Sequence, residues 1–291
     1  MTRLGVVALT SVAMTAFAGN SLLCRAALDH TAIDAASFTT IRLVSGAVAL
    51  WLIARFRAGS RRASGSWISA FALFAYAAGF SFAYDNLSAG TGALLLFGAV
   101  QATMIGYGMW SGERLRGVQV IGLLLACGGL VGMLLPGVSA PPLAGSLLML
   151  GAGVAWGVYS LRGKGACDAT GVTAGNFLRS VPLAVAVSLL MLGEASVDPT
   201  GFWLAVASGA LASGVGYAIW YAALPALKAA SAATVQLSVP VIAALGGVAF
   251  LGEPITLRLA VASAAVLGGI ALVIIEKQRH ADVVDSRDRP R

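Results

Sequence analysis

The residues that could do chemistry in this chain are the few charged and polar side chains within or beside long apolar runs. Arg42 and Arg179 lie inside such runs, whereas each Asp and Glu lies at the end of a run or beyond it. A charge deep in an apolar medium costs several kcal/mol unless it is paired. These two arginines therefore need either a partner or a function.

Two glutamates are the candidate partners, because Glu113 and Glu253 each follow a glycine where an apolar run ends. Counting along the runs places Arg42 at the depth of Glu253 and Arg179 at the depth of Glu113. We therefore predict two ion pairs that act as gates on opposite sides. The alternative is that both arginines extend toward water or cap helix ends, while both glutamates simply face water.

Aromatic and amide side chains inside apolar runs are the candidates for binding a solute. Tyr76, Phe80 and Tyr84 recur every four residues, which places them on one helix face. Such a stripe would stack on a planar or large apolar solute. The alternatives are an aromatic belt at a membrane interface and, for the amides, hydrogen bonding between helices. The candidate set is Asn20, Tyr76, Phe80, Tyr84, Gln101, Trp156, Tyr159, Trp220, Tyr221 and Gln236.

Cysteine and histidine usage argues against a metal site, a cofactor site or an enzyme. Cys24, Cys127 and Cys167 are far apart and show no CxxC spacing, and His30 and His280 lie outside the apolar runs. The net charge of +7 could indicate nucleic acid as a partner, but the positive residues gather in short breaks between runs. We expect no nucleic-acid partner, and a lipid bilayer and a small-molecule solute instead.

The elements that must position these side chains are membrane helices. The chain is 58% hydrophobic and 11% charged over 291 residues, well below the roughly 25% charged residues of a soluble domain. A membrane helix needs about 20 apolar residues, and this length predicts ten spans. They are residues 4–24, 33–54, 67–84, 91–111, 117–135, 143–161, 173–193, 201–223, 230–251 and 257–275.

The positions of the Lys and Arg residues predict the orientation of the spans. Most of the 19 lie before the first span, in every second break or after the last span, and Arg25 and Arg258 are the two in the other breaks. The positive-inside rule then places both termini in the cytoplasm. Residues 1–24 could also pass for a signal peptide, but the repeat described next requires them as a span.

The chain matches itself weakly at offsets of 136 to 140 residues. Arg25 falls on Arg162 and Arg42 on Arg179 at 137, and Glu113 falls on Glu253 at 140. Five spans form one repeat, and because five is odd the second copy enters the membrane in the opposite sense. We predict an all-α integral membrane protein with two inverted-topology repeats, residues 4–135 and 143–275, and a cytoplasmic polar tail, residues 276–291. This architecture is typical of secondary transporters.

The ordered motifs resemble the drug/metabolite transporter superfamily, and specifically a pair of tandem EamA-type repeats. The resemblance rests on Arg42 and Arg179, on the Gly-Glu pairs that end at Glu113 and Glu253, and on a glycine pair in each fifth span. It implies a ten-helix metabolite exporter. Together with the aromatic stripes, it favours exporters of aromatic amino acids of the YddG type.

We therefore expect an alternating-access exporter of amino acids, aromatic or other large neutral ones, in a bacterial-type plasma (inner) membrane. The lack of acids within the spans favours a neutral or zwitterionic solute, with uncoupled facilitated diffusion as one mode of transport. The alternative is a carrier of another solute class, such as a sugar, nucleoside or drug, with proton coupling as an option, since a fold does not encode its substrate.

Overall fold

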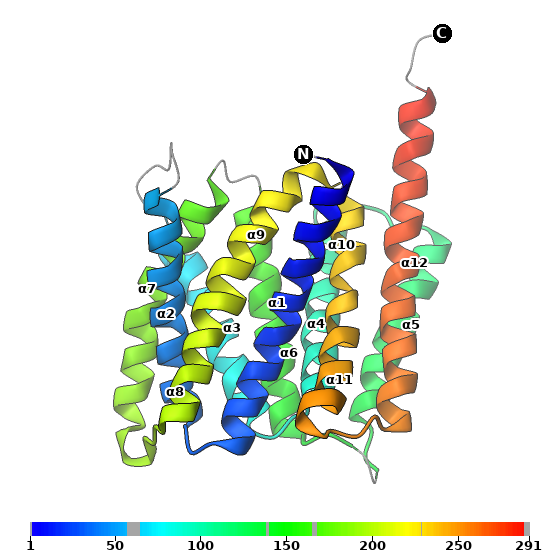
Figure 1. Cartoon of the computed structure of the whole chain (residues 1–291). Helices are drawn as coiled ribbons and strands as arrows, with labels where there is room; N and C mark the ends of the chain where they lie inside the picture. The colour runs from blue at the N-terminus through cyan, green and yellow to red at the C-terminus, as the bar shows by residue number, and fades with distance from the viewer. Residues whose placement is uncertain (1, 57–64, 138–139, 165–167, 228, 288–291) are drawn as a thin grey trace.

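The computed structural model describes residues 2–56, 65–137, 140–164, 168–227 and 229–287. Ten helical segments within these ranges are long and apolar enough to cross a membrane, and the same ranges contain no strand. The structure confirms an all-α, ten-span integral membrane fold (Figure 1).

The helices fall into two sets of five spans. The first set comprises α1 (Arg3–His30), α2 (Ala35–Phe56), α3 (Trp67–Tyr84), α4 (Ala89–Trp110) and α5 (Gly117–Leu134). In the second set, three spans are single helices: α6 (Leu143–Gly163), α7 (Ala169–Leu190) and α12 (Leu257–Arg287). The span after α7 consists of four consecutive elements: α8 (Pro199–Val206), η2 (Ala207–Val215), α9 (Gly216–Ala223) and η3 (Leu224–Ala226). The next span consists of α10 (Ala229–Gln236) and α11 (Ser238–Leu251). A short 3₁₀ turn, η1 (Leu192–Glu194), follows α7.

The two sets run in opposite senses through the bundle. The N-terminus and the C-terminus lie at one end, called here the terminal end, and the other end is the opposite end (Figure 1). α1 starts at the terminal end, whereas α6 starts at the opposite end (Figure 1). This is the arrangement that the predicted inverted repeat requires.

The main helix contacts join one set to the other. α5 packs on α12, α3 and α4 pack on α6, α2 packs on α7 and η2, and α1 packs on α11, η2 and α9. The centre of the bundle therefore lies at the interface between the two halves, where residues from distant parts of the sequence meet.

Glycines allow the close contact between α5 and α12. A Cβ added to Gly122 would meet the carbonyl oxygen of Gly269 at 2.5 Å, and one added to Gly129 would meet Ala265 and Val266 at 2.9 Å. Gly128 has no such neighbour within 4 Å. Of the adjacent glycines Gly128 and Gly129, only Gly129 therefore packs between the two helices.

Several predicted boundaries were wrong. α1 continues to His30 instead of ending at residue 24. The last predicted span, 257–275, agrees with the apolar part of α12, Leu257–Glu276, and the helix itself continues to Arg287. The predicted span 230–251 breaks at Leu237, between α10 and α11. Pro240 has no N–H to donate to the carbonyl of Gln236, which accounts for the break.

The predicted span 201–223 is not a regular α-helix. Its middle third, η2, is a nine-residue π-helix, a form that is rare and frequently found at functional sites. A Cβ on Gly209 would collide with the backbone oxygen of Arg42. The π-helix thus brings its backbone directly against α2 beside the buried arginine.

Candidate functional site

The buried centre of the interface is organised around Arg42. Arg42 on α2 is 1% exposed and is the largest of the fully buried side chains in the described residues. Its Nη2 donates a hydrogen bond to Tyr76 Oη at 2.9 Å. The guanidinium carbon lies 5.2 Å from the centre of the Tyr76 ring and 4.7 Å from that of Phe80. Ring faces at this distance attract a cation, so α3 provides Arg42 with aromatic neighbours and one hydroxyl group.

A row of polar side chains extends from Tyr76 to the second half of the chain. Asn20 on α1 donates from Nδ2 to Tyr76 Oη at 3.3 Å, and Ser208 on η2 donates from Oγ to Asn20 Oδ1 at 2.7 Å. All three residues are buried. The row joins α1, α3 and the π-helix at one point in the core.

Trp156 on α6 is the centre of an aromatic stack beside this row. Its ring lies nearly parallel to those of Tyr159 and Tyr217, with centroids 5.2 Å and 5.3 Å away, and 4.8 Å from the ring of Tyr76. Tyr217 on α9 also contacts Phe17 and Phe177. The stack brings together aromatic residues that are widely separated in the sequence.

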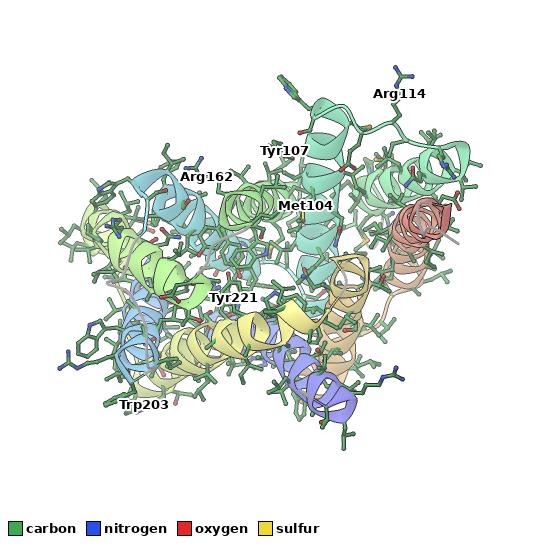
Figure 2. All side chains as sticks on the ribbon, turned by 90° about the horizontal axis from the view of Figure 1, so that it is seen from above. Met104, Tyr107, Arg114, Arg162, Trp203 and Tyr221 are labelled. Atoms are coloured by element: carbon green, nitrogen blue, oxygen red, sulfur yellow. The ribbon has the colours of Figure 1, made fainter. Side chains whose placement is uncertain are left out.

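The other predicted aromatic residues occupy the flanks of this cluster. Tyr84 meets Phe80 edge to face at 4.7 Å and donates from Oη to the Ala89 carbonyl at 3.2 Å. Trp220 contacts Phe17 at 6.1 Å. Viewed along the bundle, Tyr221 lies between helices, whereas Trp203 lies at the rim (Figure 2).

Gln101 and Gln236 are not brought into the cluster. Gln101 is buried on α4, and Gln236 is half-buried at the end of α10. Among the described residues, no hydrogen bond links either amide to Arg42, Tyr76 or Asn20. The structure thus brings eight of the ten predicted solute-binding residues into one core region and its flanks, and in the described residues no hydrogen bond connects the two glutamines to Arg42, Tyr76 or Asn20.

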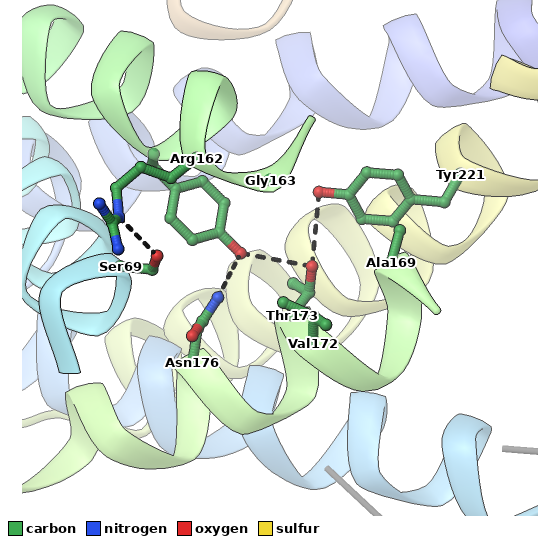
Figure 3. A pocket seen from close by; sticks show the side chains of 9 residues that line it. Ser69, Arg162, Gly163, Ala169, Val172, Thr173, Asn176 and Tyr221 are labelled. Carbon is green, nitrogen blue, oxygen red and sulfur yellow. Dashed lines mark hydrogen bonds between the residues drawn. The ribbon is translucent and has the colours of Figure 1, made fainter. Parts of the chain in front are cut away.

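A small pocket opens at the terminal end of the interface, between α3, α6, α7 and α9 (Figure 3). Tyr159 lies at its inner wall, where Asn176 Nδ2 donates to Tyr159 Oη at 3.4 Å and Tyr159 Oη donates to Thr173 Oγ1 at 3.3 Å. Thr173 in turn donates to Tyr221 Oη at 3.4 Å, and Arg162 Nε donates to Ser69 Oγ at 3.1 Å (Figure 3). The pocket therefore ends at the aromatic stack.

The opposite end of the interface is joined by Glu253, which follows α11. Its carboxylate pairs with Arg25 Nε at 3.2 Å and accepts from the backbone N–H of Ala89, the first residue of α4, at 2.8 Å. Arg25 also donates to the carbonyl groups of Tyr84 and Asp85. We call the contact of Arg25, Glu253 and Ala89 the latch.

The latch corrects the predicted Arg42–Glu253 pair. Glu253 does connect the two halves, but its cation is Arg25 on α1, near the helix end, whereas Arg42 points into the core toward Tyr76. Arg42 and Glu253 were predicted to pair because they lie at similar depth. Depth alone does not decide pairing, because the rotation of each helix about its axis decides which side chains face each other.

The predicted Arg179–Glu113 pair is also not formed in this structure. Arg179 is half-buried and donates from Nη1 to the carbonyl of Gly175, one turn earlier on α7, at 3.0 Å. Glu113 is exposed beyond the end of α4, with its carboxylate close to Gly108. Arg179 thus donates a hydrogen bond to a backbone carbonyl of its own helix and does not pair with a carboxylate of the other half.

A second cross-connection at the opposite end uses the loops before α2 and before α8. Asp34 Oδ2 accepts from the N–H of Ser196 at 2.9 Å, and Asp198 Oδ1 accepts from the N–H of Ala32 at 3.1 Å. Burial disfavours ionisation of Asp34, but hydrogen bonds from Ser37, Ser196 and Ala36 outweigh it and lower the pKa of its carboxyl group. Each loop therefore holds the other through a carboxylate.

Comparison with known proteins identifies the architecture. The model of the EamA-like transporter family matches residues 143–275. Uncharacterized protein PA1977 of Pseudomonas aeruginosa is 58% identical over 267 residues, which cover 91% of this chain and 93% of that protein.

Residues 143–275 of the chain belong to the EamA-like transporter family.

More distant proteins resemble a part of this chain or its fold alone. Threonine/homoserine exporter RhtA of Escherichia coli K12 is 35% identical over 149 residues, which cover 48% of this chain and 49% of RhtA, so the match spans about half of each protein. A solved crystal structure with 21% identity superposes with a TM-score of 0.67 and covers 96% of this chain and 100% of its own. That likeness shows the fold alone. The family supports the expectation of a drug/metabolite transporter in a membrane.

Several residues of the site lie outside the predicted set of ten. Tyr217 has a sequence signal, since it shares a helix face with the predicted Trp220 and Tyr221. Arg25 is one of the two positive residues in the sparsely charged breaks, which could have marked it. Ser208 has a signal too, since it is one of the few polar residues at depth within a span. Asn176 was not singled out, because its contacts depend on helix packing. No three His, Cys, Asp or Glu side chains of the described ranges form a metal-binding group.

Proposed function

We propose that this EamA-like transporter exports small neutral amino acids by alternating access between its two halves. The observation that carries the proposal is the unequal state of the two ends of the interface. The opposite end is joined by the latch, whereas the terminal end holds a pocket that leads to the aromatic stack. A carrier that alternates needs one end closed while the other admits solute.

The similarity to RhtA supports amino acids as the solute class, with threonine and homoserine as the first candidates. The absence of Asp and Glu within the spans supports a zwitterion with no net charge and facilitated diffusion as the mode of transport. Aromatic amino acids are the second candidate, because the rings of Tyr76, Trp156 and Tyr217 lie in one stack that a planar side chain could join.

The distribution of Lys and Arg supports a bacterial-type inner membrane location with both termini in the cytoplasm. In that orientation the pocket faces the cytoplasm and the latch closes the outer side. The structure then represents the state that receives solute from inside the cell, as an exporter requires.

The internal repeat indicates how the second state would close. At the repeat offsets, Arg25 corresponds to Arg162, Glu253 to Glu113, and Ala89 to Ala229 at the start of α10. We propose that Arg162, Glu113 and the N-terminus of α10 form the inner latch when the outer one opens. The twin glutamates would then serve as gates, each with the arginine that ends the first span of the other half.

Transport in proteoliposomes tests the proposal. Vesicles preloaded with radiolabelled threonine, homoserine, phenylalanine or tryptophan are diluted, and release is compared with that from protein-free liposomes. We expect threonine and homoserine to leave fastest, with rates unchanged by a pH gradient.

Each other outcome has a defined meaning. Release of phenylalanine and tryptophan alone would support the second candidate. Strong acceleration by a pH gradient would contradict facilitated diffusion. If no amino acid is released while a sugar, nucleoside or drug is, the amino-acid proposal is wrong.

A further inference from the structure

Arg42 is a buried cation for which the described residues supply no counter-ion. Nη2 has Tyr76 Oη as its acceptor, but Nε and Nη1 have no hydrogen-bond acceptor among the described residues. The ion pairs of the described ranges involve Arg25, His30 and Arg116, not Arg42. The sequence has no Asp or Glu within a span that could approach it.

Such an arrangement is costly for the protein alone. Removing a charge from water is repaid only when a partner of opposite charge and further hydrogen bonds compensate it. Arg42 is the eighth residue of α2, about 10 Å from the helix start at 1.5 Å per residue. Its stem is therefore about two helical turns inside the span, and none of the ion pairs of the described residues reaches it.

Tyr76 adds a further unused donor at the same place. Its Oη accepts from both Arg42 Nη2 and Asn20 Nδ2. A phenol that accepts twice still has its own hydrogen to donate, and no described residue accepts it. Arg42 and Tyr76 together therefore leave the N–H groups of two guanidinium nitrogens, Nε and Nη1, and one O–H group for an acceptor that carries negative charge.

We infer that Arg42, with Tyr76, binds the carboxylate group of the transported solute. A guanidinium offers a planar fork of donors that matches a carboxylate. The rings of Tyr76 and Phe80 shield the pair from water, which strengthens the electrostatic attraction. The inference rests on the proposed function only in taking the ligand to be the solute, and it defines the solute class as one that carries a carboxylate.

The aromatic stack gives a route from the pocket to this site. Tyr159 lines the pocket, Trp156 stacks on Tyr159, and Trp156 also contacts Tyr76, which bonds Arg42. A rotation of Trp156 would therefore connect the pocket with the arginine. In the structure described here, Trp156 lies between them.

Thermal unfolding of the purified protein in detergent tests the inference. Threonine, threonine amide, acetate and chloride are titrated separately at constant ionic strength, and the shift of the melting temperature gives an apparent Kd for each. We expect threonine and acetate to raise the melting temperature and the amide, which lacks the carboxylate, to leave it unchanged.

Variants assign the effect to Arg42. Arg42→Gln is expected to weaken threonine binding about 30-fold or more, the usual result of removing one member of a buried charge pair. Without ligand, it should melt no lower than the wild type, because it removes an uncompensated charge. Arg42→Lys keeps the charge without the fork, so we expect binding about tenfold weaker. The matched control is Arg55→Gln, an exposed arginine at the other end of α2, with no change expected.

Several results would overturn the inference. These are equal stabilisation by threonine and its amide, stabilisation by chloride equal to that by acetate, and a folded Arg42→Gln variant that still responds to carboxylates. If Arg42→Gln does not fold, the Arg42→Lys variant decides: an affinity for threonine equal to that of the wild type would overturn the inference.

The test separates this inference from the proposed function. If no amino acid is released from proteoliposomes, but acetate still stabilises the wild type through Arg42, the amino-acid proposal fails and the carboxylate site stands. If threonine is released and its amide is released equally well, the proposed function stands and the carboxylate site fails.

Discussion

Glu253 joins three parts of the chain through one carboxylate. It pairs with Arg25 on α1 and accepts from the N–H of Ala89 at the start of α4, while its own position follows α11. The first N–H groups of a helix have no partner within that helix and attract negative charge. The glutamate therefore satisfies a helix N-terminus and an arginine of the other half together.

Replacing Glu253 tests the latch at this scale. Glu253→Gln keeps the shape but removes the charge, and we expect it to weaken the closed state by about 1–3 kcal/mol, as for a lost charge-assisted hydrogen bond. Leu87 lies buried next to Ala89 at the opposite end. A cysteine introduced at Leu87 should react with a membrane-impermeant maleimide severalfold faster in the Glu253→Gln background.

The matched control is Glu194→Gln, which changes an exposed glutamate at the same end. Its labelling rate should equal that of the wild type. If Glu253→Gln does not change the labelling of Leu87→Cys in a folded protein, Glu253 does not hold that end closed.

The π-helix η2 positions the site at the scale of elements. Its wider turn places Ser208 against Asn20 and Gly209 against the backbone of Arg42. η2 thus meets α2 backbone to backbone and meets α1 through the hydrogen bond between Ser208 and Asn20. This close approach depends on glycine, since a Cβ on Gly209 would meet both the Arg42 oxygen and Ser45 Oγ.

Gly209→Ala should therefore separate η2 from α2. Because backbone atoms cannot move aside as a side-chain end can, we expect destabilisation of about 1–3 kcal/mol, typical of overpacking. The melting temperature in detergent should fall by several degrees, and carboxylate-dependent stabilisation should weaken.

The control for this change is Gly106→Ala, in a helix and with no atom within 4 Å of the added Cβ. Ala is the better helix former, so this variant should melt at the wild-type temperature or slightly higher. A Gly209→Ala variant as stable as Gly106→Ala would show that the contact with α2 is not tight.

At the scale of the whole molecule, the two halves hold each other at the opposite end through the latch and through the paired loops. Asp34 contributes to both the fold of one loop and its contact with the other, because it accepts from Ala36 and Ser37 on α2 and from Ser196. These hydrogen bonds stabilise the ionised carboxylate of Asp34, and the pKa of Asp34 is lowered for that reason. Stability of the assembled halves is therefore linked to pH through this carboxyl group.

Asp34→Asn should lower the melting temperature at neutral pH. A carboxyl group whose pKa is lowered in the folded state contributes stability above its unfolded pKa of about 3.9 and loses that contribution as the pH falls through the folded value. The difference between wild type and Asp34→Asn should thus be constant from pH 7 to about 5 and shrink below about pH 4. Melting curves across this range, with the exposed Asp85→Asn as control, measure it. A difference that does not vary with pH would contradict the assignment.

Much of the fold could be predicted because its determinants are local. The length and apolar composition of ten segments, and the odd number of spans per repeat, predict the bundle and the opposite senses of its halves. The i, i+4 spacing of Tyr76, Phe80 and Tyr84 correctly predicts a shared face. The π-helix escaped prediction, whereas Pro240 inside a span predicts an interruption of that helix, which is found at Leu237.

The sequence by itself determined that two arginines lie within spans and that no acid does, because hydropathy and residue type settle depth. Only the tertiary structure decided the partners. Glu253 meets Arg25 and not Arg42, and Arg42 meets Tyr76 and keeps two donors unused. Depth is a property of position along one helix, whereas pairing depends on how each helix is rotated and packed against the others, which no local pattern specifies.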